Sequence, residues 1–312
     1  MTTTNQQPDW AFIINPVAGA GIALEVEKEL QKQLKQRDIA AEIVFTARKG
    51  HASELAKELA NSNYKYIVAV GGDGTFNEMA SELVKHPQCT MGHIPAGTGN
   101  DFAQIIGLPA KFDDSYWDIF FEAKTHKLDV GRCNGKLFFN GMGLGFDAQV
   151  AAENYSPTGE VKQGGKGKYI WHILKNLLFF KEQKMQITTD NQNTTELCFM
   201  QTVAIGRRFA GDFFITPEAY ADDNLLDVCL VKKLNLFQRL SILLKVPKGT
   251  HITNPNVHYY KTPELIVETD KKVPFHLDGE LFFDTRFEID ILQEKPSIIF
   301  NSSGNNFFSK AK

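Results

Sequence analysis

Hydrophobic and polar residues follow two different periods along the first third of the chain. Compact apolar runs, typical of buried strands, occur at Ala11–Ile14, Ala41–Phe45, Tyr66–Val70 and Met91–Pro95. Apolar residues at helical spacing predict helices between these runs, over Ile22–Arg37, about Ala52–Ala60 and Phe76–Val84. Strands that alternate with helices predict a parallel sheet covered by helices on both faces.

From about residue 127 the pattern changes to period two. Lys127–Cys133 and Lys136–Asn140 flank Asn134-Gly135, a strong signal for a two-residue hairpin turn. One helix, Tyr169–Phe180, is predicted to interrupt the strands. Further strands are predicted at Met185–Thr189, Glu196–Ile205, Leu226–Val231, Val257–Tyr260, Glu264–Glu268 and Arg286–Ile291. The second part of the chain therefore reads as a mainly antiparallel domain.

The expected architecture is an α/β domain over residues 1–127 followed by an all-β domain over residues 128–294. The apolar run Ser297–Phe300 fits either sheet, so the tail from about residue 295 to 312 is free to pack back on the first domain. A chain of 312 residues is long enough for two such cores.

Composition narrows the function classes. A formal net charge of -3 argues against general nucleic-acid binding. No apolar run approaches the length of a membrane span, and the N-terminus lacks the layout of a signal peptide, so we expect a cytoplasmic chain with no transmembrane segment. The four cysteines and eight histidines are scattered, without the spacing of a zinc site or a disulfide framework.

Glycine-rich turns follow three of the predicted strands, at residues 15–21, 71–75 and 95–101. In a parallel sheet such strand-to-helix turns lie on one edge, where ligands normally bind. Glycine lets the backbone approach a phosphate, and helix N-termini supply N–H groups and partial positive charge. A lone glycine turn is more often structural, but three at one edge favour a phosphate site.

Asp73 lies inside the second of these turns. A carboxylate beside a phosphate is repulsive unless a divalent cation lies between them, which predicts Mg²⁺ bound with ATP. The alternative is an aspartate that only stabilises its own turn. The chain contains neither a Walker A loop nor the kinase H-R-D and D-F-G elements, and Leu24 stands where a dinucleotide fingerprint needs its third glycine.

Three motifs, INPVAGAG, VGGDGTFNE and IPAGTGNDFA, resemble the nucleotide-binding signatures of the diacylglycerol kinase catalytic domain, and specifically those of its soluble bacterial lipid kinases. GGDGT alone is shared with NAD kinases and, in variant form, with phosphofructokinases. In the second half, PEAYADDNLLDV resembles a segment that holds a structural Mg²⁺, and HLDGE resembles the catalytic D-G-E. The resemblance covers nearly the whole chain. It implies an N-terminal domain like that of NAD kinases and phosphofructokinases, a C-terminal β-sandwich, and an ATP site in the cleft between them.

The resemblance also assigns roles to individual residues. Residues implied to hold ATP are Asn15, Gly19, Gly21, Thr46, Gly71, Gly72, Asp73, Gly74, Thr75, Asn77, Glu78 and Thr98. Those implied to hold the structural metal are Tyr220 and Leu225 through their carbonyls and Asp223 through its carboxylate. Asn224 replaces the commoner glycine there, so the sequence leaves Asp222 and Asp223 hard to rank as the ligand.

Glu280 is the candidate general base, because a lipid hydroxyl must lose its proton as it attacks the γ-phosphate. Asp278 would orient the site or contribute to magnesium binding, and Asp73 completes the catalytic set. Spacing alone would favour an ordinary hairpin turn at Asp278-Gly279, and only the accompanying motifs make Glu280 catalytic.

Six lysines and one acid lie between residues 162 and 184, around the apolar stripe of the predicted helix and Trp171. This composition fits contact with an anionic membrane surface, and it equally fits a helix that packs on the sandwich with its lysines in water. Membrane contact would make the chain a peripheral membrane protein.

The function predicted is an ATP- and Mg²⁺-dependent lipid kinase, with diacylglycerol as the first candidate substrate. Phosphatidylglycerol, a sphingoid base and a polyprenol are the other candidates, since the sequence does not specify the lipid. An NAD kinase and a nucleotide-binding lipid regulator without turnover are the competing functions. Whether the chain forms a homodimer is not determined by the sequence.

Overall fold

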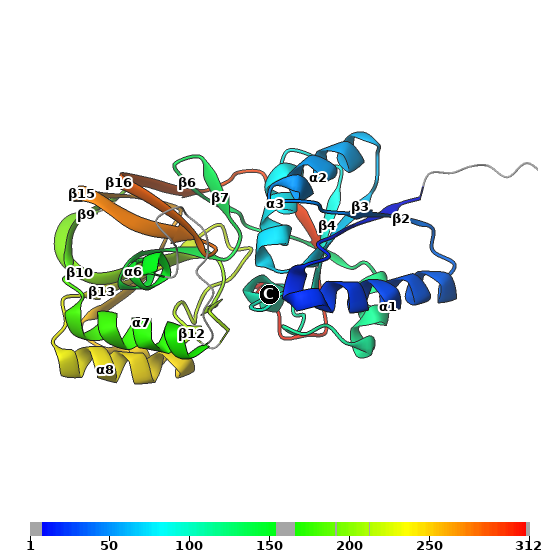
Figure 1. Cartoon of the computed structure of the whole chain (residues 1–312). Helices are drawn as coiled ribbons and strands as arrows, with labels where there is room; N and C mark the ends of the chain where they lie inside the picture. The colour runs from blue at the N-terminus through cyan, green and yellow to red at the C-terminus, as the bar shows by residue number, and fades with distance from the viewer. Residues whose placement is uncertain (1–7, 154–165, 191, 212, 310–312) are drawn as a thin grey trace, which may run out of the picture. The chain divides into compact units, whose positions relative to one another are not determined.

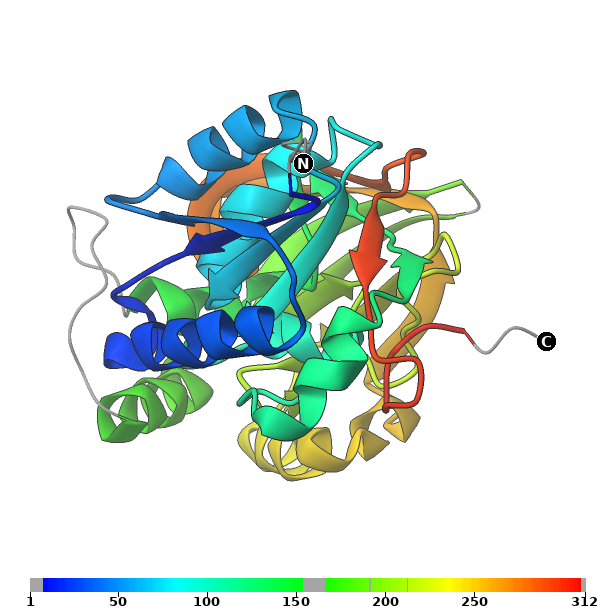
Figure 2. The same cartoon turned by 90° about the vertical axis from the view of Figure 1, so that its right-hand side faces the viewer.

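The computed structural model describes residues 8–153, 166–190, 192–211 and 213–309. They form two compact units: Met1–Asp129 with Gln293–Lys312, and Val130–Leu292. Both predicted fold classes are confirmed, since the first unit is α/β and the second is built on an antiparallel sheet. Figures 1 and 2 show the course of the chain in two views.

The first unit is built on a six-stranded sheet in the order β2-β1-β3-β4-β17-β5. Neighbouring strands are parallel except for β5, which is antiparallel to β17. Figure 1 shows α1 on one side of this sheet and α2 with α3 on the other. The strands are β1 (Trp10–Ile14), β2 (Ala41–Phe45), β3 (Tyr66–Gly71), β4 (Thr90–Pro95), β5 (Thr125–Lys127) and β17 (Ser297–Ile299).

The helices of the first unit bury their apolar stripes against the sheet, which explains the helical spacing in the sequence. Ala23, Leu30 and Leu34 of α1 are buried in this way, as are Phe76 and Met79 of α3. The helices are α1 (Ile22–Gln36), α2 (His51–Asn61), α3 (Asp73–Leu83), α4 (Asp101–Ile105) and α5 (Trp117–Phe121), with 3-10 turns η1 (Ala18–Gly21) and η2 (Asp114–Tyr116).

The second unit is built on a nine-stranded sheet whose strand pairs are all antiparallel. Asn134 and Gly135 turn between β6 and β7 with positive φ angles of 49° and 79°, so the predicted hairpin is present. The strands are β6 (Gly131–Cys133), β7 (Lys136–Phe138), β8 (Gly141–Gly145), β9 (Gln183–Thr189), β10 (Gln192–Ala204), β13 (Leu226–Lys232), β14 (Val257–Thr262), β15 (Glu264–Leu277) and β16 (Glu280–Ile291). A separate small ribbon pairs β11 (Arg208–Phe209) with β12 (Phe213–Phe214).

The prediction of a single helix among these strands is wrong, since the described residues of the second unit contain three α-helices. The predicted helix is α7 (Lys166–Phe179), and the two further ones are α6 (Phe146–Glu153) and α8 (Leu236–Lys245). The 3-10 turns η3 (Val246–Lys248) and η4 (Thr250–Thr253) follow α8. Asn235 begins α8 with a capping box, in which its side chain and that of Gln238 each accept a backbone N–H bond.

The prediction of one continuous strand over Lys127–Cys133 is also wrong. The segment is divided between β5 in the first sheet and β6 in the second. Between them Asp129 is fully buried and paired with the half-buried Lys295 at 2.6 Å, so the chain changes sheets at this ion pair. The run that the sequence left unplaced forms β17, between β4 and β5 of the first sheet.

Candidate active site

The three predicted glycine turns lie at the carboxyl ends of β1, β3 and β4, which are neighbours in the first sheet. Asn15, after β1, donates its side-chain N–H to the hydroxyl of Thr75 in α3 at 3.0 Å. A Cβ built on Gly97 would lie 2.3 Å from the Cα of Gly72, so these two turns touch through their backbones. The structure therefore brings the three turns together, as the sequence predicted from strand order.

Thr46 follows β2 at the same edge of the sheet. Its backbone N–H donates to the carbonyl of Ile14 at 2.9 Å, and the residue is half-buried. Thr98 and Gly99, in the turn after β4, are exposed. The fold thus places Thr46 at the edge of the sheet that carries the predicted turns, and Thr98 within the third of them.

Asp73 connects two of the turns. Its carboxylate accepts the backbone N–H groups of Asp101 and Phe102 at 3.1 Å each, at the start of α4. These bonds give Asp73 a structural role. The sequence had offered a structural role as the alternative, but for stabilising its own turn, whereas Asp73 stabilises the neighbouring turn. Each carboxylate oxygen retains acceptor capacity for a hard cation, so the donor chemistry at Asp73 fits Mg²⁺.

Glu78 has its carboxylate directed to another helix. It accepts the backbone N–H of Gly50 at 2.8 Å and of Ala52 at 3.3 Å, where α2 begins. Helix N-termini carry N–H groups without intrahelical partners, and a carboxylate satisfies them. This geometry favours a capping role over the predicted contact with ATP phosphates, to which a carboxylate would be repulsive.

His93 was not identified from the sequence. It is fully buried on β4, and its Nε2 lies 3.2 Å from the carbonyl oxygen of Gly71. Burial lowers the pKa of His93, although the charge of Asp73 and the Gly71 carbonyl act in the opposite direction. A single histidine inside an apolar strand gives no periodic signal, so only the fold shows that a neutral imidazole lies beneath the turn.

The glycines of the turns fall into two groups. A Cβ on Gly19 would lie 2.4 Å from the Ala96 carbonyl oxygen, and one on Gly71 would lie 2.7 Å from the Thr75 hydroxyl, so packing within the protein requires these glycines. Gly74, in the first turn of α3, differs because no described atom other than those of its chain neighbours and of its own helix backbone lies within 4 Å of its Cβ position. The space over Gly74 is open to a ligand at a helix N-terminus.

In the second unit, Asp278 and Gly279 form the hairpin turn between β15 and β16, with φ angles of 45° and 88°. The Asp278 carboxylate accepts the backbone N–H groups of Phe139, Asn140 and Gly141 at 2.7, 3.0 and 2.8 Å. Asp278 therefore fixes the turn against the segment before β8. Glu280 begins β16 directly after this turn and is exposed.

His276 and Asp147 lie near this turn. The Nε2 of His276 on β15 is 3.4 Å from an Asp147 carboxylate oxygen on α6. A Cβ on Gly143 of β8 would lie 1.9 Å from that oxygen, so the glycine makes room for the pair. No periodic or motif signal in the sequence pointed to Asp147 as a partner of His276.

In the segment implied to bind a structural metal, the candidate carboxylate is paired with a lysine from β14. One oxygen of Asp223 accepts the Leu225 N–H at 3.1 Å, and the other lies 2.8 Å from the Lys261 ammonium. Lys261 also lies 3.2 Å from the buried carboxylate of Asp227, and its ammonium is over the Tyr220 ring. Asn224 has the left-handed φ of 61° that its place in the turn suggested. A divalent ion at Asp223 would have to displace Lys261, so these residues do not fit a metal as they stand.

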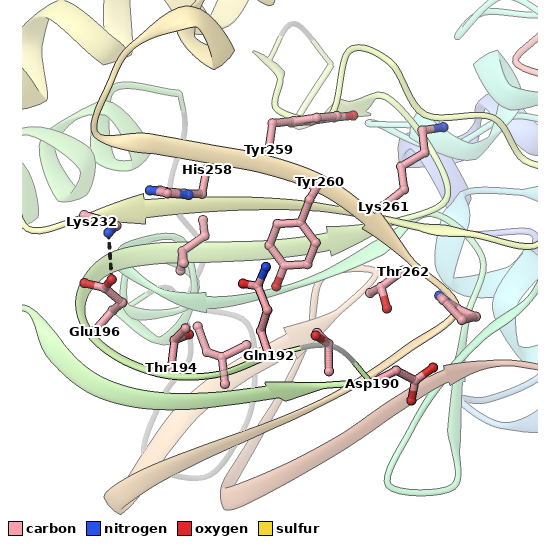
Figure 3. Close-up of a pocket in the computed structure, with 14 residues that line it drawn as sticks. Asp190, Gln192, Thr194, Glu196, Lys232, His258, Tyr259, Tyr260, Lys261 and Thr262 are labelled. Carbon is pink, nitrogen blue, oxygen red and sulfur yellow. Dashed lines mark hydrogen bonds and ion pairs between the residues drawn. The ribbon is translucent and has the colours of Figure 1, made fainter.

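A separate pocket of about 370 Å³ lies in the second unit (Figure 3). His258, Tyr260 and Thr262 of β14 point to one side, opposite Gln192 and Thr194 of β10. Lys232 in its wall is paired with Glu196 at 2.6 Å, so this cation is already neutralised. None of the predicted site residues lines the pocket.

Comparison with known proteins identifies the family. The model described as "Diacylglycerol kinase catalytic domain" matches residues 9–133, and that described as "YegS C-terminal NAD kinase beta sandwich-like domain" matches residues 141–295. Residues 9–133 belong to the diacylglycerol kinase catalytic domain family. The prediction of an enzyme, a phosphotransferase of this family, is thereby confirmed.

Curated relatives agree with this assignment. The chain is 25% identical over 272 residues to a diacylglycerol kinase of Staphylococcus carnosus, covering 86% of this chain and 87% of the relative. It is 26% identical over 271 residues to a diacylglycerol kinase of Bacillus subtilis, covering 86% and 88%.

Solved structures share the fold. The crystal structure of a diacylglycerol kinase from Bacillus anthracis strain Sterne has a TM-score of 0.72 at 20% identity, covering 96% of this chain and 100% of that chain. A second structure from the same organism has a TM-score of 0.77 at 23% identity, covering 97% and 99%. No helix in the described parts of this family member is long and apolar enough to cross a membrane.

Proposed function

We propose that the chain transfers the γ-phosphate of ATP to the hydroxyl of a membrane lipid, with diacylglycerol as substrate and phosphatidic acid as product. The diacylglycerol kinases among its relatives support this substrate class. The observation that carries the proposal is the convergence of three glycine turns beside Gly74, whose side-chain space is open at the N-terminus of α3.

In the proposed reaction, backbone N–H groups of the glycine turns and of the first turn of α3 bind the phosphate oxygens of ATP. Asp73 would hold Mg²⁺, which when bound neutralises charge that develops on the phosphoryl oxygens. The lipid oxygen forms a bond to the γ-phosphorus as the bond to the bridging oxygen breaks and ADP leaves. Glu280 accepts the hydroxyl proton, and Asp278 holds the turn that positions Glu280.

The test is incubation with labelled ATP and a panel of lipids, followed by identification of the phosphorylated product. We expect diacylglycerol to be labelled, and loss of turnover by about 10²-fold or more in Glu280→Gln with ATP binding retained. Labelling of phosphatidylglycerol, a sphingoid base or a polyprenol alone would change the substrate. With NAD added to the panel, labelled NADP would indicate an NAD kinase, and absence of any product would leave a nucleotide-binding regulator.

A pair of glycine variants tests the phosphate site. Gly74→Ala places a methyl group in open space at a helical position, so its thermal midpoint should stay the same or rise while its KM for ATP increases. Gly97→Ala is the control, because its methyl group would collide with Gly72 and lower stability directly. Unchanged ATP kinetics in Gly74→Ala would remove α3 from the phosphate site.

A further inference from the structure

The outer surfaces of α7 and α8 carry an unusual concentration of exposed apolar side chains. Of the fifteen large hydrophobic residues that are exposed in the described parts of the chain, eight lie on these two helices. They are Trp171, Leu174, Leu178 and Phe179 on α7, and Leu236, Phe237, Leu240 and Leu244 on α8. We call these eight residues the α7–α8 face. Exposed apolar side chains gathered on two neighbouring helices are typical of an interaction site.

The face is separate from the inner surfaces that hold the helices in place. Leu177 and Phe180, in and after α7, and Ile242 of α8 pack with Phe199 and Val231 in one buried cluster. On α8 the exposed residues Phe237, Leu240 and Leu244 follow the spacing i, i+3, i+7 on the opposite side. Phe237 is 83% exposed and Leu244 is 77% exposed, so neither side chain contributes to the core.

Arg239 fixes the two helices to each other. It donates to the carbonyls of Leu177 at 2.7 Å and Phe180 at 3.0 Å, where α7 ends, and to Glu182 at 2.7 Å. Figure 1 shows α7 and α8 side by side. These bonds therefore hold the apolar stripes of α7 and α8 in a fixed arrangement relative to each other. Glu182, the only acid among residues 166–184, is half-buried in this ion pair rather than displayed on the face.

The charges around the face are basic. Lys181, Lys233, Lys245 and Lys248 are exposed at the ends of the two helices. The sequence contains no Asp or Glu from Val228 to Pro263. Glu153 of α6, which reaches toward α7, is paired with Lys175 at 3.1 Å. Protein interfaces are depleted in lysine, whereas helices that lie on anionic bilayers combine an apolar stripe with flanking lysines.

We propose that the α7–α8 face docks the chain on an anionic lipid bilayer. The apolar stripes of both helices enter the interface between headgroups and acyl chains, and the flanking lysines contact anionic headgroups. The sequence had suggested membrane contact only for residues 162–184. Residues 162–165 of that region lie outside the described residues, and α8 supplies a second stripe that the sequence did not identify. The inference rests on the proposed function in that a lipid substrate resides in a bilayer.

Vesicle sedimentation without ATP tests the docking directly. Wild-type chain should bind vesicles of phosphatidylglycerol and phosphatidylcholine more strongly than vesicles of phosphatidylcholine alone, and binding should weaken between about 0.1 M and about 0.5 M salt. The double variant Phe237→Gln/Leu244→Gln should lose vesicle binding by about tenfold or more, because two apolar side chains that insert into the bilayer are removed. Lys245→Glu/Lys248→Glu should lose the preference for anionic vesicles.

Leu197→Gln is the matched control, since Leu197 is 46% exposed in the same unit but lies on β10. Its vesicle binding should equal that of the wild type. All these side chains face solvent, so thermal midpoints should not change. Equal binding by the wild type and the α8 double variant would overturn the proposal. The proposal would also be overturned if the wild type did not bind vesicles and formed a dimer, while the double variant was a monomer. The α7–α8 face would then be an interface between copies of this chain.

Activity on a short-chain, water-soluble diacylglycerol separates this inference from the proposed function. Retained turnover on that substrate, with loss of turnover on vesicles in the double variant, would support both. Vesicle binding by a wild type that phosphorylates no lipid would support docking and refute the kinase function.

Discussion

Carboxylates in this chain show how little a motif says about the partner of a side chain. Glu78 and Asp73 both belong to the GGDGTFNE stretch, yet Glu78 accepts two N–H groups of α2 and Asp73 accepts two of α4. The positions of the glycines along the sequence were sufficient to predict three turns on one edge of the sheet. It was not sufficient to show which carboxylates serve a ligand, because those bonds join residues that are 26 to 29 positions apart in the sequence.

Lys261 provides a test at this scale. Lys261→Met should lower the thermal midpoint, because Asp227 is buried and would lose its cation beside Asp223. Each kcal/mol lost should shift the midpoint by about 2–4 °C. Without ATP, neither Mg²⁺ nor a chelator should move the midpoint of the wild type, whereas Mg²⁺ should partly restore the variant. A chelator that lowers the wild-type midpoint would show instead that a divalent ion is bound there.

At the scale of the element, the sequence predicted long periodic segments and missed those whose pattern is mixed. The strand β8 reads GMGLG, and glycine is a weak strand former, so no alternation was visible. Its glycines are required by neighbours: Phe209 lies within 2.5 Å of a Cβ on Gly141. Helix α8 carries apolar residues on both its buried and its exposed sides, which obscures the single stripe that marks an ordinary surface helix.

Arg239 links two elements, and its removal should be severe. Arg239→Met would leave Glu182 and two carbonyls at the end of α7 without their cationic donor, so we expect about 3 kcal/mol less stability. Burial opposes ionisation of Glu182, but the hydrogen bond and charge of Arg239, together with backbone N–H groups, outweigh burial and lower the pKa of Glu182. Urea unfolding measures the change. Arg286→Met, an exposed arginine paired with Glu268, is the control, and equal losses in the two variants would contradict this account.

Stability of the whole molecule should depend on pH through a buried histidine. His251 is buried and its Nε2 lies 3.1 Å from the Ile215 carbonyl oxygen. Burial lowers its pKa below the ordinary value of 6.5, although the Ile215 carbonyl acts in the opposite direction. Below that value the unfolded chain therefore binds a proton that the folded chain resists.

The free energy of unfolding should consequently fall as pH decreases from about 6.5, by up to about 1.4 kcal/mol per pH unit for this group. Urea unfolding between pH 7.5 and pH 5.5 would show how the free energy of unfolding changes with pH. These endpoints lie about one unit on either side of the ordinary histidine pKa. His251→Gln should reduce the slope without abolishing it, because burial also lowers the pKa of His93. His258→Gln, at an exposed position, is the control. A slope that His251→Gln leaves unchanged would assign the decline to other groups.

The place of β17 in the first sheet has a consequence for synthesis on the ribosome. Its residues 297–299 follow the whole second unit in the sequence, yet they pair with β4 on one side and β5 on the other. Chains emerge N-terminus first, and domains generally fold as units in that order. Here the nascent first unit lacks an internal strand until residue 299 has left the exit tunnel, so it exposes the edge of β4 while the second unit forms.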